Sequence, residues 1–158
     1  MHAMQRRALK NGAIAGLAGG AAMAANILID LPLTRGVAND FRLLGQVGPL
    51  RRHWRITGPL IHMGNAVALG AVYSVVEPCL KGNGSVRGMT FGMAENMGLW
   101  PLVLLLDHIH PAIQEGDLSR YGAPFPFTIE VIRHLSYGAA LGYVYELLTK
   151  RDAASVGG

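Results

Sequence analysis

The chain has 158 residues, which is enough for one domain. Apolar residues make up 51% of it and charged residues only 15%, below the roughly 25% usual in soluble domains. Its formal charge of +4 comes from short basic clusters beside apolar segments, which excludes the broad basic surface of a nucleic-acid-binding protein. The single Cys79 excludes an internal disulfide and a metal site of four thiolates.

Four apolar segments follow one another along the chain, and each is expected to form a helix: about 11–31, 56–77, 86–107 and 128–149. Roughly 20 such residues, at ~1.5 Å each, span the ~30 Å hydrocarbon core of a bilayer. The fourth segment is the weakest, because it carries Glu130, Arg133 and Glu146. The first lacks the polar face of a soluble helix, so we expect an all-α integral membrane four-helix bundle with the lipid bilayer as its surroundings.

The first segment also has features of a secretory signal. Arg6, Arg7 and Lys10 precede the apolar stretch, and a small-residue motif at 22–24 imitates a cleavage site. The segment has a counterpart later in the chain, however, and its removal would leave that counterpart unpaired. We therefore expect it to be retained as the first span.

The connections differ in length and character. Residues 34–55 form a long basic connection in which Val37, Phe41 and Leu44 are spaced for one helical face, which predicts a segment along the membrane surface. The short link at residues 81–85 is turn-like, and we expect a loop at residues 108–127. We expect residues 151–158 to form a disordered tail. The basic flank of the first helix and the short link favour cytoplasmic N- and C-termini.

An internal repeat organises these segments. The pattern His-x7-Gly-x2-Tyr occurs at 62–73 and again at 134–145, and a Gly-x3-Gly step precedes each copy, at 12–16 and 88–92. The period is about 75 residues, which predicts two similar helix hairpins. Small residues let membrane helices approach closely, so we assign helix packing to Gly12, Gly16, Gly20, Gly70, Gly88, Gly92, Gly138 and Gly142. The same glycines would also suit a homo-oligomer or a larger membrane complex.

Several polar residues fall near the middle of the predicted spans. Charged and polar side chains at that depth face the protein interior and find partners. We expect one polar layer made of Asn26, His62, Asn65, Glu95, Asn96 and His134. His62 and His134 should face each other or this layer, with Asn26 or Asn65 as their hydrogen-bond partners.

Three functions remain open for the polar layer. A hydrogen-bonded layer that fixes helix register would belong to a non-enzymatic structural or accessory subunit. Alternatively, Glu95 would carry a proton or small solute across the membrane. In a third reading, His62 and His134 would bind a haem b iron from two sides.

Evidence for other chemistry is weak in this sequence. Asp107, His108 and His110 form a short cluster that resembles a transition-metal site, although such a cluster beside a proline is more often accidental. No serine lies in a catalytic motif, and the glycines have no phosphate-loop spacing. We therefore expect a protein that is not an enzyme and has no resident metal.

The motifs RALKNGAIAGLAGG, the two His-x7-Gly-x2-Tyr patterns and Arg-Gly-x3-Gly together resemble a known type of protein. The chain is similar to small bacterial inner-membrane proteins of uncharacterised function, of the YagU-like type. The resemblance covers about residues 7–148. It implies a four-helix, multi-pass integral protein of the inner (cytoplasmic) membrane and no defined activity.

Overall fold

The computed structural model describes residues 2–47 and 51–156, and the described chain is all-α. The elements are α1 (His2–Leu33), α2 (Asp40–Gly45), the 3-10 turn η1 (Arg51–His53), α3 (Trp54–Val76), the 3-10 turn η2 (Glu77–Cys79), α4 (Gly84–Ile109), α5 (Pro111–Gln114) and α6 (Pro124–Val156). Four long helices, α1, α3, α4 and α6, pack together, which confirms the predicted all-α class.

Three of these helices are long and apolar enough to cross a membrane. The candidate spans are Met4–Leu33, Arg51–Cys79 and Gly84–Ile109. They confirm the first three predicted spans at the level of length and composition. Within the described residues, α6 is not among the candidate membrane spans. This agrees with the charges at Glu130, Arg133 and Glu146, which interrupt its apolar sequence.

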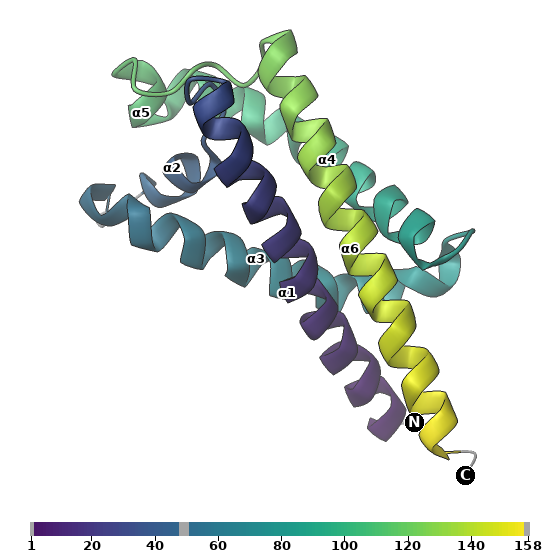
Figure 1. The fold of residues 1–158 in the computed structure, drawn as a ribbon. Coiled ribbons are helices and arrows are strands. Elements are labelled where there is room, and N and C mark those ends of the chain that lie inside the picture. The colour runs from purple at the N-terminus through teal and green to yellow at the C-terminus, as the bar shows by residue number, and fades with distance from the viewer. Residues whose placement is uncertain (1, 48–50, 157–158) are drawn as a thin grey trace.

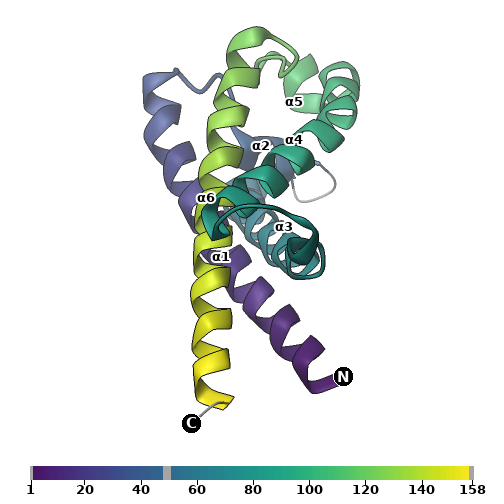
Figure 2. The ribbon, with the colours of Figure 1, turned by 90° about the vertical axis from the view of Figure 1, so that its right-hand side faces the viewer.

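The long helices are arranged around the pair α1 and α6. These two helices pack against each other and run in opposite directions, so that both chain ends lie at the same end of the molecule (Figures 1 and 2). α3 packs on α1, and α4 packs on α6. Although η2 joins α3 to α4 directly, the principal helix contacts of the described chain do not include that pair.

Glycines lie where the helix backbones approach most closely. A Cβ atom added to Gly12 would stand 2.3 Å from the carbonyl oxygen of Gly70, at the crossing of α1 and α3. A Cβ on Gly88 would stand 1.9 Å from the carbonyl oxygen of Gly138, at the crossing of α4 and α6. The remaining predicted packing glycines, Gly16, Gly20, Gly92 and Gly142, lie at the same two crossings.

The helix ends and connections differ from expectation. α6 continues through Val156, so residues 151–156, expected to be a disordered tail, are helical, while 157–158 lie outside the described residues. The connection 34–55 contains α2, which packs against α3, and its place along the membrane surface stays a prediction. A reason is visible at Gly58, where a Cβ would lie 1.9 Å from the carbonyl oxygen of Phe41. Residues 48–50 of this connection lie outside the described residues.

Candidate functional site

A pocket of about 440 Å³ opens between α3 and α4, the two long helices that diverge. α2, α6, Met23 of α1 and Tyr121 of the loop before α6 line the rest of it. Apolar side chains cover much of it, including Leu69, Leu99 and Val103. We call this space the interhelical pocket, and its polar lining includes His62, Asn65, Glu95, Asn96, His134 and Tyr137.

The pocket contains five of the six residues expected in the polar layer. His62 and Asn65 come from α3, Glu95 and Asn96 from α4, and His134 from α6. Asn26 is not among the lining residues. Its amide instead donates to the hydroxyl oxygen of Ser136, at 2.5 Å, where α1 meets α6. Five of the expected residues therefore line one pocket, whereas Asn26 contributes to the contact between α1 and α6.

His134 joins two carboxylate residues. Its Nδ1 lies 2.8 Å from the carbonyl oxygen of Glu130, and because a carbonyl only accepts, Nδ1 carries a hydrogen and donates it. Its Nε2 lies 3.1 Å from Oε2 of Glu95. That contact needs one proton, carried either by the imidazole or by the carboxyl group. Glu95 and His134 therefore share a proton-binding site on the pocket wall.

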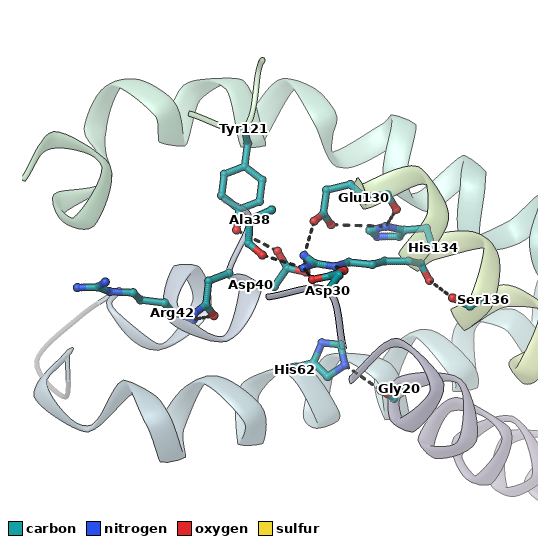
Figure 3. A network of polar contacts seen from close by, with 12 residues as sticks. Gly20, Asp30, Ala38, Asp40, Arg42, His62, Tyr121, Glu130, His134 and Ser136 are labelled. Atoms are coloured by element: carbon teal, nitrogen blue, oxygen red, sulfur yellow. Dashed lines mark hydrogen bonds and ion pairs between the residues drawn. The ribbon is translucent and has the colours of Figure 1, made fainter. Parts of the chain in front are cut away.

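His62 uses the backbone of α1 as its partner. Its Nε2 donates to the carbonyl oxygen of Gly20 at 3.0 Å (Figure 3). Its ring meets Phe41 edge to face, with ring centroids 5.4 Å apart. Neither Asn26 nor Asn65 fills this role. Since both ring nitrogens of His134 are also engaged, the arrangement does not fit a haem iron held between the two histidines.

Arg133 is the centre of a buried ionic network beside the pocket. Its side chain is fully buried, and its guanidinium donates twice to the carboxylate of Asp30, at 2.6 and 2.9 Å. It also donates to Asp40 at 3.0 Å and to Glu130 at 2.7 Å. Figure 3 shows the three carboxylates converging from α1, α2 and α6. This network ties the ends of three elements together.

Sequence reasoning missed this network. It treated Arg133 only as one of the charges that weaken the fourth apolar segment. The available signal was an arginine and a glutamate three residues apart in an otherwise apolar segment, together with Asp30 at the end of another. Three acidic partners for one arginine are recognisable only when the chain is folded.

Tyr121 extends the network from the loop between α5 and α6. Its hydroxyl donates to Asp40 at 3.0 Å. Burial raises the pKa of Tyr121 well above its usual range, and the negative charge of Asp40 raises it further. The phenol therefore stays protonated and acts as a hydrogen-bond donor that holds α2 against the loop.

The cluster considered for a metal has structural partners. Asp107 accepts hydrogen bonds from the backbone N–H groups of Tyr121 and Gly122, both at 2.7 Å. His110 accepts from the N–H of Ala112 through Nδ1 and donates from Nε2 to the carbonyl of Leu43 at 2.9 Å. His108 is exposed. Within residues 2–47 and 51–156, no group of three potential ligands is arranged for a metal ion.

The fold and the site together define a class: a helical protein with three candidate membrane spans and a partly polar pocket between its helices. The chain belongs to DUF6789, a family of unknown function whose model matches residues 6–156. No curated protein and no solved structure matches it. The resemblance to YagU-like proteins agrees with this at the coarse level of a helical, membrane-type protein without assigned activity.

Proposed function

We propose that this protein is a non-enzymatic accessory membrane protein that holds a small lipophilic molecule in the interhelical pocket. The pocket itself carries the proposal. Its volume of about 440 Å³ lies within the roughly 300–1,000 Å³ of typical ligand sites. Apolar walls with a few convergent polar groups are the usual construction of such sites. The non-enzymatic assignment rests on the absence of catalytic motifs in the sequence.

The proposal includes α6 as a fourth membrane span. The charges of Glu130 and Arg133 are paired inside the protein, so they do not face lipid. The outer face of α6 carries the exposed side chains of Ile132, Tyr143 and Leu147. A buried charged side and an exposed apolar side are the pattern expected of a helix that faces protein on one side and lipid on the other.

Two similar hairpins remain our interpretation of the chain. Supporting it, residues at equivalent offsets make equivalent contacts, Gly12 with Gly70 and Gly88 with Gly142. The equivalent tyrosines Tyr73 and Tyr145 also pack edge to face, with ring centroids 5.3 Å apart. Both ends of the chain lie at the same end of the molecule, which suits cytoplasmic N- and C-termini in a bacterial inner membrane.

Occupancy of the pocket is measured through Trp100, which lines it. In a Trp54→Phe background the protein is placed in nanodiscs, and a bromine-tagged dodecanol is titrated as a contact quencher of tryptophan fluorescence. We expect saturable quenching. Ala68→Phe, which fills the pocket, should weaken binding by about tenfold or more, equivalent to 1.4 kcal/mol.

Ala94→Phe is the matched control, since Ala94 is exposed on α4 and outside the pocket lining. It should leave the titration unchanged. Quenching that rises linearly with probe concentration, or that is equal in both variants, would show that Trp100 reports only lipid partitioning and would contradict the proposal.

Proton transfer is a second candidate, favoured by the line of groups from Glu95 through His134 to Glu130. Oε2 of Glu130 lies 3.8 Å from Nδ1 of His134, so a small movement would complete the relay. The measurement is proton flux into liposomes containing the wild type, Glu95→Gln, or the surface control Glu115→Gln. Flux lost only in Glu95→Gln would favour transport over the accessory role.

A further inference from the structure

Two buried polar groups belong to residues that line the interhelical pocket, and they have no hydrogen-bond partner in the described part of the protein. They are Nδ2 of Asn96 and the hydroxyl of Tyr137, in residues that are only 4% and 3% exposed. Buried polar groups are nearly always paired, because they lose their hydrogen bonds to water on folding. Two such groups in one pocket point to a ligand that pairs with them.

These groups come from neighbouring helices. Asn96 follows Glu95 on α4, and Tyr137 lies one helical turn from His134 on α6. The contact between Glu95 and His134 brings the two helices together at this level. Asn96 and Tyr137 therefore flank that pair and mark the polar end of the pocket.

Both unpaired groups are donors. The amide nitrogen of asparagine only donates, and a phenol hydroxyl donates one hydrogen while also accepting. A head group that accepts hydrogen bonds would satisfy them. An ammonium group carries donors only, so it would leave Nδ2 of Asn96 unpaired.

The charge around the polar end opposes an anionic head group. Asp40, Glu95 and Glu130 line the pocket, and Asp30 adds a fourth carboxylate to the network. Arg133 pairs with Asp30, Asp40 and Glu130, and His134 pairs with Glu95, so two basic side chains face these four groups. Carboxylates thus outnumber bases, and a carboxylate or phosphate placed there would meet repulsion.

We infer that the pocket takes a neutral amphiphile whose carbonyl or hydroxyl head group accepts hydrogen bonds from Asn96 and Tyr137. Its apolar chain lies along Leu99 and Val103, and the gap between α3 and α4 gives it access from the lipid. The inference rests on the proposed ligand-binding function and adds the chemistry of the ligand.

The test uses three bromine-tagged dodecyl probes that differ only in the head group: hydroxyl, ammonium or carboxylate. Quenching of Trp100 is titrated in nanodiscs of neutral phosphatidylcholine, in the Trp54→Phe background. We expect the hydroxyl probe to bind tightest and the carboxylate probe to bind at least about tenfold more weakly. Saturable binding of at least one probe is expected if the proposed function holds.

Two variants examine the head-group contacts. Asn96→Leu should weaken binding of the hydroxyl probe, and it should also raise the Tm of the ligand-free protein, because an unpaired buried polar group is removed. Tyr137→Phe removes only a hydroxyl and should weaken the same probe without loss of folding. Met97→Leu, at an exposed position of α4 outside the pocket lining, is the control and should leave binding unchanged.

The outcomes separate the two proposals. If none of the three probes quenches saturably, the ligand-binding function itself fails. If the probes bind but the ammonium or carboxylate form binds as well as the hydroxyl form, the pocket function stands and the inference about the head group is overturned. Unchanged hydroxyl binding in both Asn96→Leu and Tyr137→Phe would overturn it as well.

Discussion

At the scale of single residues, Arg133 is the ion-pairing centre of the buried network, because it pairs with three carboxylates. A fully buried guanidinium would be too costly without partners, and three carboxylates compensate it here. The dependence is mutual, since Asp40 and Glu130 are themselves buried and need the positive charge. Loss of either side leaves charge uncompensated in a low-dielectric interior.

We predict that Arg133→Met lowers the free energy of unfolding by about 3–5 kcal/mol, because it leaves three carboxylates without a positively charged partner. Thermal unfolding in detergent measures the change. Arg51→Met is the matched control, because the Arg51 side chain is 55% exposed and its contact with Glu115 is a surface pair. It should cost less than about 0.5 kcal/mol. Equal effects of the two variants would show that the network is not a structural centre.

At the scale of elements, glycine decides which helices pack. The crossings of α1 with α3 and of α4 with α6 both depend on positions without a side chain. In a membrane such close packing supplies the attraction that apolar side chains alone do not, because lipid tails are equally apolar. α3 and α4 diverge instead, and their separation leaves room for the pocket.

A methyl group at the crossing of α4 and α6 should force the helices apart. We predict that Gly88→Ala destabilises the protein by about 1–3 kcal/mol, since its Cβ would overlap the backbone of Gly138. Gly98→Ala, on the same helix, has no neighbour within 4 Å of the added Cβ. That control should be neutral or more stable by up to about 1 kcal/mol, because alanine favours helix. Thermal unfolding of both variants checks the contrast, and a stable Gly88→Ala protein would refute close packing there.

At the scale of the whole molecule, the proposed fourth span places the outer surface of α6 in lipid. Tyr143 is 57% exposed on the surface of α6, so a cysteine there would react readily if that surface were in water. We predict that Tyr143→Cys, in a Cys79→Ser background, resists a water-soluble maleimide in intact membranes and reacts after detergent unfolding. Rapid labelling in membranes would place α6 outside the bilayer, and the protein would then have three membrane spans.

The same chemistry tests the orientation. The native Cys79 is exposed in η2, on the side we assign to the cytoplasm. It should react with an impermeant maleimide only after the membrane is opened. A cysteine at exposed Arg52, again with Cys79→Ser, should react on intact cells. The reverse pattern would invert the topology.

The sequence by itself determined the helices and the residues that let them meet. Apolar length, proline and glycine positions act locally, so three candidate spans and the close-contact glycines could be read in advance. The grouping of Glu95, Asn96 and His134 at one pocket also agrees with their predicted positions along helices of regular rise. All of these features depend on the spacing between residues that are close to one another in the sequence.

The tertiary structure alone decided the partners and the pocket. Asp30 and Asp40 lie 103 and 93 residues from Arg133 along the chain, and no local pattern links them. Asn26 was expected beside a histidine but meets Ser136, because the choice depends on how α1 turns against α6. The pocket has the same origin, since it exists only because α3 and α4 diverge while their other faces remain packed.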